Sequence, residues 1–539
     1  MPGPPLTKNK QPAPWRRARR FLLSLLVSWQ SICLAQAPPA PVQFEVNRFE
    51  VDGAWLLPPD RIDEVLAPFV GPGRTLADIQ QARAALEAAY ARRGYGATQV
   101  VLPEQELKDG VVRLRVVEAK LSSIVLEGNR FFGYTNIRES LPALQTGAPL
   151  DTAELAANLR LANENPAKQT TVVLKPGARE DEVEAQVRVA DQRPYRFSLS
   201  LDSTGTPDTG DYRVGVGFQH ANLFDRDQVL NLQYVTSPSQ ADDVLILGAG
   251  YHVPLYSLGD SIDLIAGYAN VDSGVVQNLF NISGSGRIYA GRYNFGLPRF
   301  AGIEQKLALG FDWRYYDNNV VPVGTSTAIV PDYVLHPLSL AYSGAWRGGA
   351  DEVSFYASGV RNIPGGSNGD QAQFDLVRAG APADYTLSRF NFVWVRSFPR
   401  DVQGRVRFTG QYTRDELLPA EQFGIGGLDS VRGFFEREFA GDRGYSGSFE
   451  VYSPDFGSQF EVEGLRVRVL AFYDYGRVWQ INPQVFEPSV IGISSAGPGI
   501  RIAYKSSLSA RFDYGFVIKN GGPGNPDHGR ANFSLVWVF

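Results

Sequence analysis

Residues 466–476 read Arg-Val-Arg-Val-Leu-Ala-Phe-Tyr-Asp-Tyr-Gly, and this run decides the fold class. Its odd-numbered positions carry only Val, Ala and Tyr, whereas Arg466, Arg468 and Asp474 stand at even-numbered positions. A period of two indicates a β-strand whose two faces meet different surroundings. A charge at the centre of a bilayer costs about 2–4 kcal/mol, so the charged face is expected to line a closed lumen while the other face meets lipid. The run therefore predicts one strand of a transmembrane β-barrel.

The same alternation continues over the whole chain from residue 195 onward. The segments lie at 195–203, 212–220, 228–235, 244–253, 260–270, 286–296, 305–315, 334–346, 352–361, 386–397, 405–413, 446–454, 465–477, 497–505, 508–518 and 531–539. The longest connections, at 271–285, 316–333, 362–385 and 414–445, all follow odd-numbered strands. Outer-membrane barrels have long outer loops and short periplasmic turns. The sequence therefore predicts a sixteen-stranded barrel over residues 195–539.

Composition favours a barrel over a helical membrane protein. The chain has 539 residues, of which 12% are aromatic and 55 are glycine. Mean hydropathy is only −0.18, as expected when alternate strand residues face lipid. No apolar stretch of about 18 residues follows residue 37, so no membrane-spanning helix is expected after that point. The net charge of −5 gives no reason to expect nucleic acid as a partner.

Residues 1–35 have the features of an export signal. A cluster of arginines precedes a short apolar stretch, and small residues follow at Ala35 and Ala37. Pro38 would hinder cleavage after Ala37, so cleavage after Ala35 is expected; a retained membrane anchor is the alternative. Cleavage would remove Cys33, the one cysteine of the chain, so the mature protein is expected to have neither disulfides nor cysteine metal sites.

Two segments in front of the barrel, 43–118 and 119–193, share a second pattern. Each reads strand, two helices, strand, strand, with helical spacing of apolar residues between alternating ends. Thr75 and Asp151 are expected to cap the longer helix of each copy. The pattern predicts two small α/β modules, and an unrelated pair of such domains is one interpretation.

The second module carries a more specific pattern. Asn163-Glu164-Asn165-Pro166, followed by Pro176-Gly177, resembles the NxNP…PG pattern of POTRA domains, the periplasmic modules of the Omp85/TpsB superfamily. The resemblance implies α+β periplasmic POTRA domains followed by an all-β, 16-stranded transmembrane barrel. An extended client segment could add to a free edge of a three-stranded sheet. The sequence leaves open which edge it would use.

The connection 414–445 contains Phe423-Gly424-Ile425-Gly426-Gly427-Leu428-Asp429-Ser430-Val431-Arg432-Gly433-Phe434. This run resembles the sixth outer loop of Omp85/TpsB transporters, whose Val-Arg-Gly-Phe/Tyr tip folds into the barrel. It also follows the eleventh expected strand, so it is the sixth outer loop by strand count. In addition, Phe472-Tyr473-Asp474-Tyr475-Gly476 resembles the Phe-x-Asp-x-Gly strand motif of the same superfamily.

The two motifs together imply a contact between loop and barrel. By resemblance, Arg432 pairs with the inward-facing Asp474. The loop motif comprises Gly426, Gly427, Val431, Gly433 and Phe434, and the strand motif includes Phe472 and Gly476. A guanidinium group matches a carboxylate through two parallel hydrogen bonds, and glycines permit a tightly folded loop. A solvated arginine in a flexible loop is the alternative.

Alternation also places a set of arginines on the lumen side of strands eleven to fifteen. The set comprises Arg405, Arg407, Arg466, Arg468, Arg501 and Arg511. This wall is expected to be largely basic, either through ordinary lumen solvation or as a surface for client contact. At the C-terminus, Trp537 and Phe539 resemble the assembly signal of outer-membrane barrels, and an interfacial aromatic anchor is a compatible interpretation.

No catalytic motif is present in the sequence. The histidines, His220, His252, His336 and His528, lack metal-ligand spacing. Neither a G-x-S-x-G elbow nor a phosphate-binding or dinucleotide fingerprint occurs. We therefore expect no enzyme activity, catalytic residue, metal or cofactor.

Two POTRA-like modules favour the TpsB branch, the haemolysin- and adhesin-secreting transporters, because insertases of the superfamily usually carry more. The resemblance implies secretion of a large unfolded TpsA-like client through a barrel in the outer membrane of a Gram-negative-type cell. Other implied partners are outer-membrane lipid and the barrel assembly machinery. The alternatives are an Omp85-type insertase and a passive porin, although a porin needs no receptor modules. Too few residues precede the first strand for a plug helix, so the loop alone is expected to close the pore.

Overall fold

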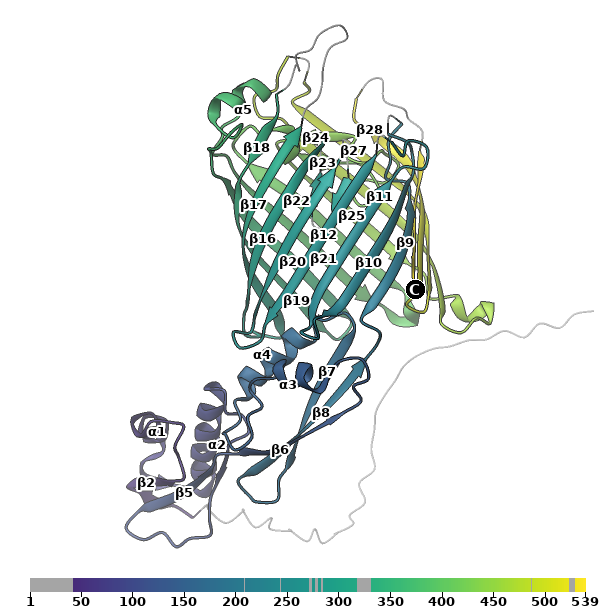
Figure 1. The fold of residues 1–539 in the computed structure, drawn as a ribbon. Helices are drawn as coiled ribbons and strands as arrows, with labels where there is room; N and C mark the ends of the chain where they lie inside the picture. Colours follow the sequence, from purple (N-terminus) through teal and green to yellow (C-terminus); the bar gives the residue numbers. More distant parts are fainter. Residues whose placement is uncertain are drawn as a thin grey trace, which may run out of the picture.

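The computed structural model describes residues 42–539 except 208, 243, 271–273, 277–279, 283–284, 318–330, 486 and 523–528. The expected export signal, Cys33 and His528 lie outside the described residues. Figure 1 shows a β-barrel with two α/β modules in series below one rim. We call this rim the near rim and the opposite one the far rim. No helix among the described residues is long and apolar enough to span a membrane.

The first module is a mixed sheet with two helices packed on it. Its elements are β1 (Phe44–Val46), β2 (Arg48–Asp52), α1 (Pro59–Leu66), η1 (Ala67–Phe69), β3 (Gly71–Arg74), α2 (Leu76–Arg92), β4 (Gln99–Val101) and β5 (Val111–Val117). The strand order is β2-β5-β4, with β2 parallel to β5. Thr75 caps α2 as the sequence predicts, in a reciprocal pair with Asp78. Leu66, Leu86 and Leu114 lie in the core between helices and sheet.

The second module repeats this arrangement next to the barrel. Its elements are β6 (Lys120–Glu127), α3 (Tyr134–Glu139), α4 (Thr152–Ala162), β7 (Lys168–Pro176) and β8 (Glu182–Asp191). The order β6-β8-β7, with β6 parallel to β8, matches that of the first module. Asp151 caps α4 by accepting hydrogen bonds from the amides of Ala153 and Glu154. Both modules bury an apolar core between their helices and one sheet face.

Sixteen strands of the described residues close into an antiparallel barrel. They are β9 (Tyr195–Asp202), β10 (Arg213–Leu223), β11 (Gln228–Thr236), β12 (Leu245–Leu255), β13 (Asp260–Ala269), β16 (Ser285–Gly296), β17 (Ile303–Asp317), β18 (Tyr333–Leu335) with β19 (Pro337–Gly348), β20 (Asp351–Asn362), β21 (Thr386–Ser397), β22 (Gln403–Thr413), β25 (Arg443–Tyr452), β26 (Leu465–Trp479), β27 (Val490–Tyr504), β28 (Leu508–Asn520) and β29 (Arg530–Val538). β18 and β19 both pair with β17 and form one strand interrupted at His336. The predicted strand number is confirmed.

The barrel closes between its first and last strands. Residues 198–202 of β9 pair with residues 534–538 of β29, a shorter ladder than those between neighbouring strands elsewhere. Phe539 extends this pairing, because its amide and carbonyl bond to those of Phe197 at 3.0 Å each. The C-terminal residue therefore helps to close the barrel.

The connections contain elements that alternation did not predict. They are the hairpins β14 (Gly274–Val276) with β15 (Phe280–Ile282) and β23 (Phe423–Ile425) with β24 (Phe439–Gly441), helix α5 (Gln371–Val377), and the short helical turns η2 (Pro399–Asp401), η3 (Pro419–Glu421) and η4 (Gly457–Phe460). β27 begins at Val490 rather than near 497, because Ile491 and Ile493 pack against the loop inside the lumen. The inward positions in this part of β27 are therefore apolar, so the alternation of polar and apolar residues that predicted the other strands is absent here.

Candidate functional site

The loop between β22 and β25, residues 414–442, folds inward and fills part of the lumen; we call it the lumen loop. Its hairpin β23–β24 carries an apolar cluster against the wall, formed by Ile425, Val431 and Phe434 with Val478 of β26 and Ile493 of β27. Gly476 of β26 leaves the space for this contact. A Cβ at that position would lie 3.0 Å from Val431 Cγ2 and 3.1 Å from Ile425 Cγ2.

Glycines allow the loop tip to lie directly on the barrel backbone. Gly426, Gly427 and Gly433 have φ angles of 106°, 103° and 92°, which residues with a Cβ rarely adopt. A Cβ on Gly433 would also lie 2.7 Å from the carbonyl oxygen of Gly515 in β28. The amide of Gly433 donates to Asn532 Oδ1 of β29 at 2.9 Å. The tip thus contacts β26, β28 and β29.

Arg432, at the tip, is 2% exposed and contacts Asp474 of β26. Its Nε lies 2.7 Å from Asp474 Oδ2 and its Nη2 lies 2.8 Å from Asp474 Oδ1. The backbone amide of Arg432 donates to the same carboxylate at 3.1 Å. Its guanidinium carbon lies 3.5 Å from the ring centroid of Phe472. The two motifs that the sequence paired are therefore in direct contact, with a bidentate geometry that fixes the arginine's orientation.

Arg432 also binds side chains that sequence reasoning did not select. Its Nη1 lies 2.8 Å from Glu450 Oε1 of β25 and 3.4 Å from Asp513 Oδ1 of β28, and Nη2 donates to Ser448 Oγ at 3.0 Å. Three carboxylates from three strands thus surround one guanidinium group; together with Arg432 they form what we call the tip cluster. Glu450 and Asp513 stand at inward positions of alternating strands, so their orientation was readable, but their approach to the loop was not.

The predicted basic wall is largely offset by carboxylates. Arg511 lies 2.7 Å from Asp429, Arg501 2.8 Å from Asp513, Arg468 2.8 Å from Asp401, Arg405 3.8 Å from Glu450 and Arg407 3.9 Å from Asp429. For Arg466, no ion pair is found within the described part of the chain. The wall is therefore a network of paired charges rather than a bare basic surface, because the loop, β25, β28 and the turn η2 each bring a carboxylate to it.

A second cluster, which the sequence did not reveal, fixes the base of the loop at the far rim. The fully buried Glu421 accepts from Arg314 at 2.5 Å and from Arg389 at 2.7 Å. Asp442, also fully buried, lies 2.9 Å from Arg378. An apolar cluster that includes Phe374 of α5 covers these pairs. The base and the tip of the loop are thus anchored separately.

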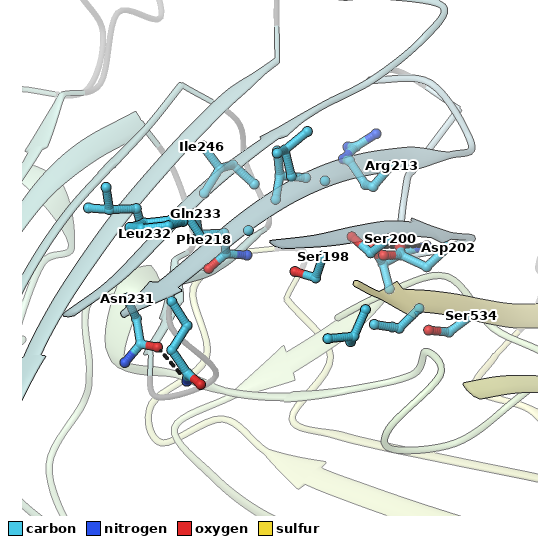
Figure 2. Close-up of a pocket in the computed structure, with 18 of the residues that line it drawn as sticks. Ser198, Ser200, Asp202, Arg213, Phe218, Asn231, Leu232, Gln233, Ile246 and Ser534 are labelled. Carbon is cyan, nitrogen blue, oxygen red and sulfur yellow. Dashed lines mark hydrogen bonds between the residues drawn. The ribbon is translucent and has the colours of Figure 1, made fainter. Parts of the chain in front are cut away.

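The lumen loop leaves two cavities beside it. One, of about 560 Å³, lies against β9, β10, β11 and β29. Figure 2 shows Ser198, Asp202, Arg213 and Asn231 among the side chains that line it. The other, of about 630 Å³, lies against strands between β13 and β22. Asp429, Glu436 and Arg437 of the loop line both cavities, so the loop separates them.

The C-terminal aromatics lie on the outer surface of the barrel. Trp537 and Phe539 are 53% and 62% exposed, and their rings meet edge to face at 5.7 Å. Phe539 also stacks on Phe197 of β9 at 6.3 Å. Both residues therefore lie on the outer face of the closing seam between β9 and β29.

Within the described part of the chain, no group of three or more His, Cys, Asp or Glu residues is arranged to hold a metal ion. The charged groups of the lumen bind one another instead. This arrangement holds the lumen loop against the barrel wall.

Comparisons with known proteins agree with this architecture. A family model described as "Haemolysin secretion/activation protein ShlB/FhaC/HecB" matches residues 182–502, more than half of the chain. A second model, "POTRA domain, ShlB-type", matches residues 44–119.

Relatives match over most of their length. The outer membrane transporter CdiB-2 of Burkholderia pseudomallei is 24% identical over 520 residues, covering 89% of this chain and 82% of the relative. The heme/hemopexin transporter protein HuxB of Haemophilus influenzae is 20% identical, covering 89% and 84%. The solved structure of CdiB from Escherichia coli aligns with a TM-score of 0.74 at 19% identity, covering 95% of this chain and 93% of that one.

Proposed function

Because the chain belongs to the ShlB/FhaC/HecB family of haemolysin secretion/activation proteins, we propose that its POTRA domains bind one unfolded client. We further propose that this client crosses the lumen after the loop that carries Arg432 moves. As a member of this family, within the Omp85 superfamily, the protein is an outer-membrane transporter of two-partner secretion and not an enzyme. The near rim is thus periplasmic and the far rim external, with the POTRA domains in the periplasm.

The proposed domain division follows the structural elements. Residues 1–35 would be the signal peptide, 43–118 and 119–193 the two POTRA domains, and 195–539 the barrel. The separate apolar cores of the two modules support the division within the periplasmic part. We further propose that the segment folded into the lumen is 414–442 rather than 414–445, because β25 begins at Arg443.

The observation that carries the transport proposal is the position of Arg432. A buried guanidinium bound to three carboxylates holds the loop across the lumen. Removing the loop from this site would expose both cavities to one another, which an extended polypeptide requires. Separation of a buried pair costs about 3–5 kcal/mol when a charge is left without compensation. We propose that contact with the client offsets this cost.

The client is proposed to be a large TpsA-like exported protein. The printed names of the relatives refer to an outer membrane transporter and to heme/hemopexin transport, so they do not agree on one cargo. Outer-membrane lipid would contact the exposed strand faces. The barrel assembly machinery would read the C-terminal strand, whose Trp537 and Phe539 are accessible.

Of the two sheet edges of the second POTRA domain, we favour β6 for client binding. The side chain of Asn163 closes β7 near the barrel, because it accepts from the Thr170 amide at 2.7 Å and donates to the Thr170 carbonyl at 3.0 Å. On β6, the backbone of Gly147 and Ala148 bonds to that of Leu121, at the end of the strand far from the barrel. β6 runs parallel to β8, which leads into β9, so a strand added to β6 would point toward the barrel mouth.

A pair of matched positions tests this choice of edge. Val125 of β6 and Val173 of β7 are both 38% exposed. A photo-crosslinking residue at 125 should capture the client during secretion, whereas the same residue at 173 should not. Capture from 173 alone would reverse the assignment.

Deletion of the gene tests the proposed function as a whole. The cells should lose one large protein from their surface or medium and keep their other outer-membrane proteins. Broad depletion of outer-membrane barrels would instead indicate an insertase. A protein encoded beside this gene that disappears from the medium would be the client.

A further inference from the structure

The second POTRA domain meets the barrel at three periplasmic turns, residues 224–227, 256–259 and 297–302. Helices α3 and α4 lie directly below this part of the rim in Figure 1. Polar side chains dominate the contact, and most of them are buried. We call this contact the joint.

Lys168, the first residue of β7, lies at the centre of the joint. Its ammonium group bonds to the carboxylate of Asp227 in the first turn, and Tyr256 of the second turn donates to the same carboxylate oxygen at 2.5 Å. The side chains of Lys168 and Asp227 are 0% and 1% exposed. Burial lowers the pKa of the Lys168 ammonium, and the adjacent Asp227 opposes that shift. The pair therefore links three segments away from water.

Amide and guanidinium groups of the POTRA domain bind backbone carbonyls of the barrel around this pair. Asn165 donates to Ala221 at 2.6 Å, Asn158 to Tyr256 at 3.0 Å, Asn136 to Asp225 at 3.0 Å and Arg160 to Leu297 at 2.9 Å. At the edge of the joint, Lys306 lies 2.9 Å from Glu164. Asn165 belongs to the NxNP stretch, which gives that motif a structural role here.

The contact between the two POTRA domains is lighter. Thr152 binds the Gly94 carbonyl through its amide at 2.8 Å and its hydroxyl at 2.7 Å, and the Gly96 amide donates to the same hydroxyl at 3.1 Å. No buried ion pair links the two domains within the described residues. Separating the joint, by contrast, would leave a buried ion and several buried carbonyls without partners until water reached them.

We propose that the second POTRA domain and the barrel remain one rigid body during transport, and that Lys168 and Asp227 are positioning residues that hold the receptor at the barrel mouth. This inference rests on the proposed function. It assigns the movements of transport to the lumen loop and to the connection between the two POTRA domains.

A disulfide across the joint tests the rigid-body proposal. A Cβ at Gly259 of the second turn would lie 3.5 Å from Ala157 Cβ of α4, within the range that disulfides require. Ala157→Cys combined with Gly259→Cys should crosslink fully under oxidising conditions and still secrete the client at the wild-type level. Each single variant controls for the substitution itself, since Gly259 has a φ of 70°. Loss of secretion on oxidation, restored by a reductant, would overturn the proposal.

Lys168→Met tests the positioning role, because it removes the cation that pairs with the buried carboxylate of Asp227. We expect at least a tenfold loss of secretion with an assembled barrel, and slower crosslinking between positions 157 and 259. Adding Asp227→Asn should restore secretion in part. The oxidised disulfide should also restore secretion in the Lys168→Met background, which a general folding defect would not allow. Normal secretion by Lys168→Met, or no rescue by the disulfide, would contradict the role.

The two proposals fail in different ways. If the transport function is wrong, the wild-type protein secretes no client, yet the crosslinking rate still reports whether Lys168 holds the joint. If the joint instead opens during transport, the wild-type protein secretes and the oxidised double-cysteine variant does not.

Discussion

Two buried cations, Arg432 in the lumen and Lys168 in the joint, hold parts of this protein together in different ways. Arg432 faces three carboxylates, and two of them, Glu450 and Asp513, also lie within 4 Å of Arg501. Lys168 bonds to one carboxylate, that of Asp227, which also accepts a hydrogen bond from the neutral Tyr256. Cavities flank the lumen loop on two sides.

The two sites therefore differ in whether another cation is near the carboxylates once the first has left. When Arg432 leaves, Arg501 can still offset part of the negative charge, and the cavities give the loop space to move. When Lys168 leaves, no other cation within the described residues is bonded to Asp227. For each carboxylate involved, losing the cation therefore costs less free energy in the lumen than in the joint.

The largest effect is expected for Arg432→Ala. The variant leaves three carboxylates around an empty position and should reduce secretion at least tenfold, since the loop loses about 3–5 kcal/mol of anchoring. The barrel should still assemble, because its strands keep their ladders. Client in the medium and the heat-dependent gel mobility of the barrel measure the two effects.

Arg347→Ala is a matched control for that variant, because Arg347 is exposed at the periplasmic end of β19. It should secrete normally. Wild-type secretion by Arg432→Ala would show that the tip cluster does not govern the loop.

A smaller effect is expected for Asp474→Asn, which keeps the shape of the side chain and removes one of the three charges. Glu450 and Asp513 still hold Arg432, so the loop should lose roughly 1.5–3 kcal/mol. Maleimide labelling of a cysteine introduced by Leu428→Cys would report how often the loop leaves its site, because Leu428 is 3% exposed while the loop is in place. Equal labelling of Asp474→Asn and Arg432→Ala would mean that Asp474 alone carries the contact.

Asn165→Ala should weaken the joint without leaving a buried charge. The variant loses the bonds to the Ala221 carbonyl and the Ala167 amide, a cost of about 1–3 kcal/mol. Limited proteolysis at the connection between the POTRA domain and the barrel should become faster, though less so than in Lys168→Met. A reversed order would contradict the central place given to the ion pair.

The smallest effect is expected for Asp78→Ala in the first POTRA domain, far from both cations. It removes one half of the capping pair with Thr75 and should cost about 1 kcal/mol. The thermal midpoint of the full chain should fall slightly while secretion stays unchanged. A secretion defect here would show that general stability, rather than the two cations, limits transport.

Much of the architecture was readable from local pattern. Alternation predicted all sixteen strands and oriented Asp474 inward, because a β-strand has only two faces and lipid excludes charge from one of them. Helical spacing and capping residues placed α2 and α4. The early start of β27 was missed, because its inward face is apolar where it meets the loop.

The contacts between distant segments were not readable in the same way. The pairing of Arg432 with Asp474 was predicted from motif resemblance. No sequence pattern predicted that Glu450 and Asp513 meet Arg432, or that Lys168 meets Asp227. Lys168 and Asp227 are 59 residues apart and look like ordinary surface charges in their local context.

The sequence by itself determined which residues face lipid, which face the lumen and where helices begin, since each of these depends on neighbours a few positions away. Only the tertiary structure decided which charges share a site. The partners of each buried charge come from segments that are distant in the sequence. The closed barrel, the inward loop and the docked POTRA domain bring these segments within hydrogen-bonding distance, and a buried charge is stable only when its partner is in place.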